Sequence, residues 1–179
     1  MKRVITTQLV AVALAAAGCT TPTPPDVAPR LPERPAVHAM HKASVGEVQL
    51  AANVAGLRRC RSLLQLELPG TPESMLRTAL TTQLEQAGLY DAGSAHRLNV
   101  ELQTADFSSG FLGSDGHWRL GLKLSNERQQ SLQVETTLVF PTHPVGYLAC
   151  RCVEQAFAPA LQQLMNELSR QPAFDALLG

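Results

Sequence analysis

Trp118-Arg-Leu-Gly-Leu-Lys-Leu124 is the stretch that decides the fold of this chain. Its apolar residues occupy every second position, which is typical of a β-strand with one buried face and one polar face. The same alternation recurs in Leu98–Gln103 and in Leu132–Phe140. A glycine- and serine-rich loop, Ser108–Gly116, separates the first two segments, and a turn at Ser125–Gln130 separates the last two. These three segments predict an antiparallel meander with one side covered.

A helix is predicted upstream of the meander. Thr71 can cap its start, Pro72 suits the first helical position, Glu73 favours the positive end of the helix dipole, and Gly88 can end it in a left-handed conformation. Between these signals apolar residues recur at helical spacing, namely Leu76, Leu80, Leu84 and Ala87. The segment is therefore an amphipathic helix with one buried face.

The C-terminal third also has a helical pattern, with a predicted buried stripe of Val153, Phe157, Leu161, Leu164 and Leu168. Pro159 lies inside this pattern and is expected to kink the helix or split it in two. Before the first helix, an apolar alternation from Val45 to Val54 predicts a strand with one irregular step. Ser62–Leu68 predicts a second, short strand.

This order of elements predicts an α+β fold in two layers. A mainly antiparallel sheet forms one layer, and two helical regions pack on one of its faces. The domain that contains them is expected to span residues 44–179, a length suited to a single core.

The N-terminus has the pattern of a bacterial export signal. Lys2 and Arg3 precede a largely apolar run, which ends in Ala16-Ala17-Gly18-Cys19. This ending resembles the lipobox of bacterial lipoproteins, in which the chain is cut before the cysteine and the thiol receives a diacylglycerol. The lipobox usually has Leu where this chain has Ala16. An ordinary secretory signal and an uncleaved anchor are the alternatives, and the run is shorter than the roughly 20 residues of a spanning helix.

The resemblance implies a signal peptide at residues 1–18 and lipid attachment at Cys19. In such lipoproteins an aspartate after the cysteine favours retention in the inner membrane, and this chain has Thr20 there. The implied location is therefore the periplasmic face of the outer membrane, where the protein is held by its lipid. Residues 19–43 are expected to form the lipidated N-terminus and a spacer, because six of the 12 prolines fall in residues 22–35.

Removal of residues 1–18 leaves 13 basic and 15 acidic residues, a net charge of −2. No basic field attracts nucleic acid, so nucleic acid is not an expected partner.

The folded part resembles a known family in two helical stretches. Met75-Leu-Arg-Thr-Ala-Leu-Thr-Thr-Gln-Leu-Glu-Gln-Ala-Gly88 and the region 153–178 are similar to the helical regions of YajG-type outer-membrane lipoproteins. The order of elements is also similar to that of PqiC-type auxiliary lipoproteins of ABC transporters. Neither resemblance implies a catalytic residue or a cofactor.

Three cysteines remain after lipidation, in a compartment where disulfides persist. Cys150 and Cys152, if helical, point to opposite sides of the helix and do not readily pair with each other. Cys60 is predicted to bond to Cys150, on the side of the Val153 stripe, with Cys152 as the alternative. A zinc site that combines these cysteines with His143 is a second alternative, which the helical geometry opposes. The sequence predicts no metal and no cofactor.

Two surface features could bind a partner. Phe111 and Leu112 lie in the Ser108–Gly116 loop, where they either contact a partner or fold back into the core. A cluster of arginines, Arg58, Arg59, Arg61 and Arg77, either contacts anionic lipid or glycan or lies on a solvated turn.

The predicted function is that of a non-catalytic binding or structural accessory of the cell envelope. The alternatives are a component of a lipid or lipopolysaccharide transport complex and an envelope hydrolase. No nucleophile motif or pair of acids supports the hydrolase.

Overall fold

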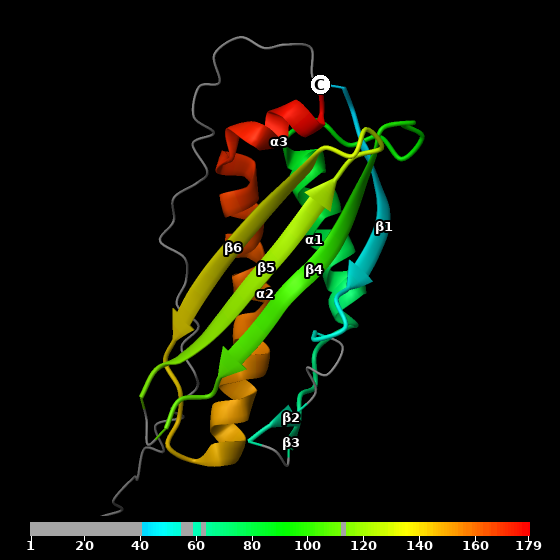
Figure 1. Ribbon diagram of the computed structural model, residues 1–179. Helices are drawn as coiled ribbons and strands as arrows, with labels where there is room; N and C mark the ends of the chain where they lie inside the picture. The colour runs from blue at the N-terminus through cyan, green and yellow to red at the C-terminus, as the bar shows by residue number, and fades with distance from the viewer. Residues whose placement is uncertain (1–40, 55–58, 62–63, 112–113) are drawn as a thin grey trace, which may run out of the picture.

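The computed structural model describes residues 41–54, 59–61, 64–111 and 114–179. The fold is α+β in two layers, with a four-stranded mixed sheet in front of the helices in Figure 1. The predicted fold class is therefore confirmed. The elements in chain order are β1 (Ser44–Leu50), β2 (Arg59–Cys60), β3 (Leu64–Gln65), α1 (Pro72–Gln86), β4 (Arg97–Ser108), β5 (Gly116–Ser125), β6 (Ser131–Phe140), α2 (Gly146–Arg170) and α3 (Pro172–Leu177).

The sheet has the order β1-β4-β5-β6. Strands β4, β5 and β6 form the predicted antiparallel meander. Strand β1 pairs with β4 in parallel, and the chain between them forms α1, as a parallel connection requires. The register of this pair shifts between Val45 and Val48, which is the irregular step that the sequence predicted.

The core lies between the sheet and the helices. The inward residues of the meander are buried, among them Leu98, Val100, Leu102, Trp118, Leu120, Leu122 and Leu124. Phe157 of α2 meets the ring of Trp118 edge-on, with 5.0 Å between ring centroids. The opposite face of the sheet is mainly polar, as the alternation predicted.

Two predicted strands are shorter than expected. Strand β1 ends at Leu50 instead of continuing to Val54, because the Val54 N–H donates to the Ala51 carbonyl in a turn at 2.8 Å. The turn places the Val54 side chain in the core. In the segment predicted as Ser62–Leu68, residues 62–63 lie outside the described part; of the described residues, Leu64 and Gln65 form strand β3, which pairs with β2 apart from the main sheet.

Helix α1 has the predicted boundaries. The Thr71 hydroxyl accepts a hydrogen bond from the Ser74 N–H at 3.2 Å, and Pro72 is the first helical residue. Gly88 follows the helix with a φ of +70°, a conformation that glycine adopts without a steric cost. Leu76, Leu80 and Leu84 form the buried stripe.

Of the two outcomes expected at Pro159, a kink or a split of the C-terminal helix, the split does not occur. Helix α2 is continuous from Gly146 to Arg170. Phe157 and Leu161, on either side of the proline, are both buried against the sheet. Burial of the stripe on both sides offsets the roughly 3 kcal/mol cost of an interior proline. The helix ends instead before Pro172, where Gln171 is extended, as residues before proline prefer.

Side chains cover backbone groups on both outer strands of the sheet. The Arg77 guanidinium donates to the carbonyls of Val45 (3.1 Å) and Gly46 (2.8 Å) at the irregular step of β1. On β6, the Gln163 amide donates to the Thr136 hydroxyl (2.7 Å) and the Thr137 carbonyl (3.2 Å). Both contacts connect a helix to an outer strand. Unpaired backbone groups on an outer strand can otherwise pair with a strand of another molecule.

The chain enters the domain next to its C-terminus (Figure 1). The His41 N–H donates to the Leu178 carbonyl at 2.8 Å, and Ala43 is fully buried. Among the helices of the described part of the chain, none combines the length and hydropathy needed to cross a membrane.

Candidate functional site

Large apolar side chains are exposed at one end of the domain. Within the described residues, those that are exposed all fall in the β4–β5 loop or between the end of β6 and the start of α2: Phe111, Val139, Val145, Tyr147 and Leu148. Phe111 is 73% exposed and Tyr147 is 58% exposed. These segments meet at the lower end of Figure 1. We call these five residues the apolar end.

Hydrogen bonds hold Phe111 in its loop. Its N–H donates to the Ser114 hydroxyl at 2.8 Å, and its carbonyl accepts from the Ser114 N–H at 3.0 Å. The Thr142 hydroxyl donates to the Ser114 carbonyl at 2.6 Å and so connects the loop to the segment after β6. The backbone at Phe111 is therefore ordered by contacts that do not involve its ring.

Arg61 connects the same loop to α2. Its Nε donates to the Ser109 hydroxyl at 3.2 Å, and its Nη2 donates to the Gly110 carbonyl at 3.0 Å. Its guanidinium also lies next to Gly146, where an added Cβ would be 3.4 Å from Nη1. Arg61 is thus placed between two segments of the apolar end.

The backbone of Arg61 adopts a φ of +50°, in the left-handed region that favours glycine. Such a conformation costs a non-glycine residue on the order of 1 kcal/mol. The hydrogen bonds to Ser109 and Gly110 give the arginine side chain a role that glycine could not supply.

A disulfide joins Cys60 to Cys150, 90 residues apart in sequence. It attaches β2 to the first turns of α2, immediately beside Arg61 in the chain. Both cysteines are buried, and Cys152 is buried as well. The sulfur of Cys150 is used in this bond, so the zinc alternative that combined it with His143 does not apply. The His143 Nδ1 accepts from the Val145 N–H at 3.0 Å.

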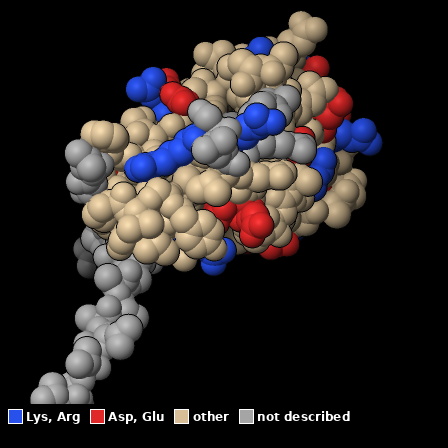
Figure 2. Space-filling view, turned by 90° about the horizontal axis from the view of Figure 1, so that it is seen from below, with Lys and Arg blue, Asp and Glu red and all other residues tan. Residues whose placement is uncertain are grey.

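Two cations accompany the apolar end. Arg59 and Arg61 are exposed, and neither forms an ion pair with another described residue. Figure 2, which looks at the domain from below, shows basic groups across the middle of this face, with acidic groups both above and below them. Asp115, in the β4–β5 loop, is an exposed acid at this end. Arg151 is paired with Glu154 at 3.8 Å.

The predicted arginine cluster is divided in the structure. Arg59 and Arg61 lie at the β2–β3 segment, whereas Arg77 covers the carbonyls of β1. Arg58 is outside the described residues.

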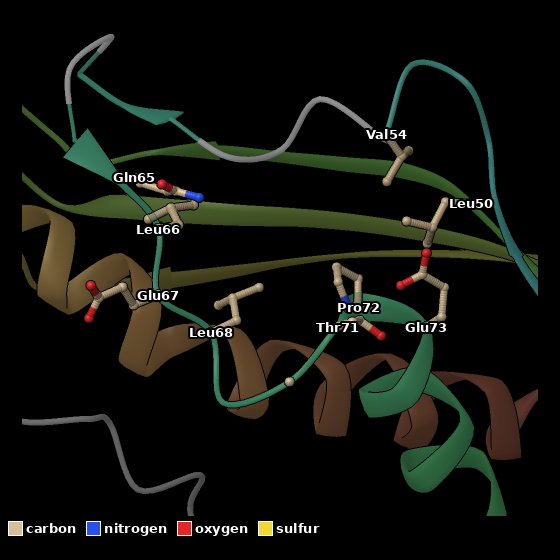
Figure 3. A pocket seen from close by; sticks show the side chains of 10 residues that line it. Leu50, Val54, Gln65, Leu66, Glu67, Leu68, Thr71, Pro72 and Glu73 are labelled. Carbon is tan, nitrogen blue, oxygen red and sulfur yellow. The ribbon is translucent and has the colours of Figure 1, made fainter.

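A cavity of about 410 Å³ lies between the end of β1, the segment after β3 and the first turn of α1 (Figure 3). Apolar and polar side chains share its walls, namely Leu50, Val54, Leu66, Leu68, Gln65, Glu67, Thr71, Pro72 and Glu73. The carboxylates of Glu67 and Glu73 disfavour an anionic ligand, and residues 55–58, which follow Val54, are outside the described part.

Histidines and acids are dispersed in the described residues. No group of three or more His, Cys, Asp or Glu side chains converges there in a way that could hold a metal ion. His41 and His96 stack with 4.8 Å between their ring centroids, at the end of the domain where the chain enters.

The predicted site residues are distributed as follows. Phe111 is exposed in the apolar end, whereas its predicted partner Leu112 and the lipid-attachment residue Cys19 are outside the described residues. Sequence reasoning missed Tyr147 and Val139. Tyr147 lies off the helical stripe that Val153 begins, and Val139 occupies an outward position of its strand, so both signals were present in the pattern.

Comparisons with known proteins give structural likenesses only. No family model matches the chain, and no curated protein matches it. The chain is similar to protein XCC0632 from Xanthomonas campestris, of family DUF330, with 16% identity, coverage of 73% of this chain and 82% of that chain, and a TM-score of 0.46. It is also similar to a minor lipoprotein from Acinetobacter baumannii, with 12% identity, coverage of 78% and 94%, and a TM-score of 0.46. A third similar structure is the PelC dodecamer from Paraburkholderia phytofirmans, with 8% identity, coverage of 76% and 93%, and a TM-score of 0.38.

Proposed function

We propose that this protein is a lipoprotein of the bacterial outer membrane, anchored through Cys19, whose periplasmic domain acts as a binding accessory of the envelope. The observation that carries this proposal is the combination of a lipobox and a buried disulfide in one chain. The lipobox directs export and lipidation. Disulfides persist in the oxidising compartment to which export leads.

The outer membrane is favoured over the inner membrane by Thr20. An aspartate at this position is the residue that retains lipoproteins of this kind in the inner membrane, and its replacement by threonine leaves no such signal. The likeness of the helical stretches to YajG-type lipoproteins supports the same location.

The apolar end supports a role in binding. Exposed apolar patches on a folded domain mark contacts with proteins or membranes. Phe111 and Tyr147 are exposed although their segments are ordered by hydrogen bonds and by the start of α2. Exposure of two aromatic rings on ordered segments is consistent with a surface that is covered in the assembled envelope.

Mass spectrometry of the mature N-terminal peptide tests the anchor. We expect the chain to begin at Cys19 and to carry the mass of a diacylglycerol and an acyl chain. The Cys19→Ala variant is expected to accumulate as an unprocessed precursor or as a soluble periplasmic form. A wild-type Cys19 without an acyl chain rejects the anchor.

Crosslinking in intact envelopes tests the accessory role. Wild type, Phe111→Ser and the remote control Glu127→Ser are expressed at equal levels, crosslinked mildly and purified. We expect wild type and the control to retain the same envelope components, and Phe111→Ser to lose them. Recovery of an ABC transporter would favour the PqiC-type transport role, and turnover of an envelope substrate by the purified protein would favour the hydrolase.

A further inference from the structure

We propose that the apolar end binds the surface of an anionic phospholipid bilayer, as a second membrane contact in addition to the lipid at Cys19. This inference rests on the proposed envelope location. It does not require the lipid itself, because the contact is made by side chains of the folded domain.

The chemistry of the apolar end is that of a membrane interface. Phe111 and Tyr147 provide aromatic rings, and aromatic side chains favour the boundary between headgroups and acyl chains. Arg59 and Arg61 provide exposed cations that no described carboxylate neutralises. Anionic headgroups attract such cations, whereas exposed acids such as Asp115 and Glu67 oppose this attraction.

Arg61 has a positioning role in this surface. Its guanidinium joins the Phe111 loop, through Ser109 and Gly110, to the start of α2, where Tyr147 follows Gly146. The two aromatic residues are therefore held on connected segments and can enter the same bilayer surface together. The cavity of Figure 3 includes no residue of the apolar end.

The chain between Cys19 and the folded domain, here called the tether, is long enough for this contact. The domain begins beside Leu178, near the end of α2, whereas the apolar end lies at the start of α2. Helix α2 has 25 residues and is therefore about 37 Å long. Residues 20–40 of an extended proline-rich chain reach up to about 65 Å. A lipid-anchored chain can thus bring the far end of its domain to the same membrane.

The tether also explains why a bilayer is the favoured occupant. A domain confined within the reach of its anchor experiences the membrane at a high effective concentration, so even a small apolar contact becomes populated. A protein partner or a second copy of the chain has to be encountered by diffusion. Both are outcomes of the experiment below.

Sedimentation with vesicles tests the inference. The mature chain with Cys19→Ser carries no lipid, so any binding comes from the domain. Vesicles of phosphatidylethanolamine and phosphatidylglycerol (3:1) are compared with vesicles of phosphatidylcholine alone. We expect binding to the anionic vesicles, weakened by about tenfold or more in Phe111→Ser/Tyr147→Ser, because two aromatic anchors are lost. Phe111→Leu should keep most of the binding.

Arginine variants distinguish binding through the apolar end from a general electrostatic attraction of the protein to anionic vesicles. Arg59→Gln should weaken binding to the anionic vesicles, whereas Arg97→Gln, an exposed arginine at the start of β4, should not. The Phe111→Trp variant provides a direct report, because Trp118, the native tryptophan, is buried and remains a constant background. Its emission should shift to shorter wavelength when anionic vesicles are added.

Three results would overturn the inference. They are the absence of binding to anionic vesicles, binding that the double aromatic variant leaves unchanged, and equal losses in Arg59→Gln and Arg97→Gln. Absence of vesicle binding together with a larger wild-type particle that Phe111→Ser dissociates would assign the apolar end to contact between copies. An acylated wild-type Cys19 would in each case leave the proposed anchor intact, and envelope crosslinking tests the accessory role separately.

Discussion

The indole Nε1 of Trp118 donates a 2.8 Å hydrogen bond to the backbone carbonyl of Val153. This bond connects the middle strand of the meander to α2 across the core, where both residues are buried. The rings of Phe107 and Phe157 both contact the indole, with centroids 4.8 Å and 5.0 Å from it. Trp118 therefore combines apolar packing with a polar contact that fixes how the helix sits on the sheet.

Replacement of Trp118 by Phe should lower the free energy of unfolding by about 1–3 kcal/mol, because the hydrogen bond is lost and the smaller ring leaves a space. Urea unfolding followed by circular dichroism measures the change, since the native tryptophan signal is absent from the variant. An unchanged midpoint would mean that the hydrogen bond from Trp118 to the Val153 carbonyl does not contribute to stability.

Removal of the Cys60–Cys150 disulfide should cost about 2–5 kcal/mol of stability. We expect the double variant Cys60→Ser/Cys150→Ser to unfold at a lower urea concentration than wild type. Thiol labelling of the unreduced, denatured protein provides the control. Labelling of both Cys60 and Cys150 in that experiment would contradict the disulfide.

Arg61 allows a test that separates side-chain contacts from backbone strain. Arg61→Ala removes the hydrogen bonds to Ser109 and Gly110 and keeps a Cβ at a φ of +50°. Arg61→Gly removes the same contacts and relieves the strain. We expect Arg61→Gly to be more stable than Arg61→Ala by roughly 0.4–1 kcal/mol in urea unfolding. Equal stabilities would contradict a left-handed backbone at this residue.

Loss of the Thr71 cap should destabilise α1. Thr71→Ala removes the acceptor of the Ser74 N–H and is expected to cost about 1 kcal/mol. Thr71→Ser keeps the hydroxyl oxygen and should stay within a few tenths of a kcal/mol of wild type. If the two variants melt together, the cap does not contribute to stability.

The exposure of Phe111 predicts a small effect on folding. Phe111→Ser should change the free energy of unfolding by less than about 0.5 kcal/mol, as substitutions on the surface do. Leu120→Ala, in the fully buried part of β5, is the matched core control and should cost about 2–5 kcal/mol. A loss of several kcal/mol in Phe111→Ser would mean that the loop folds back into the core, and the apolar end would lose its central residue.

Local patterns were sufficient for most of the secondary structure. Alternation identified β4, β5 and β6, and Thr71 with Gly88 marked the ends of α1, because the signals depend on neighbours in sequence. The continuity of α2 through Pro159 was not predictable in this way. It depends on burial of Phe157 and Leu161 against the sheet, which is a property of the packed layers.

The sequence by itself determined the α+β class and the strand and helix faces, since each follows from local spacing and residue type. The export signal that ends at Cys19 stays a prediction from the sequence. Only the tertiary structure decided that β1 lies parallel to β4, that Arg61 reaches Ser109 and Gly110, and that Phe111 and Tyr147 lie at the same end of the domain. These relationships join residues tens of positions apart in sequence. Periodicity shows which face of an element is apolar, whereas the packing of distant segments determines whether that face is buried or left exposed for a partner.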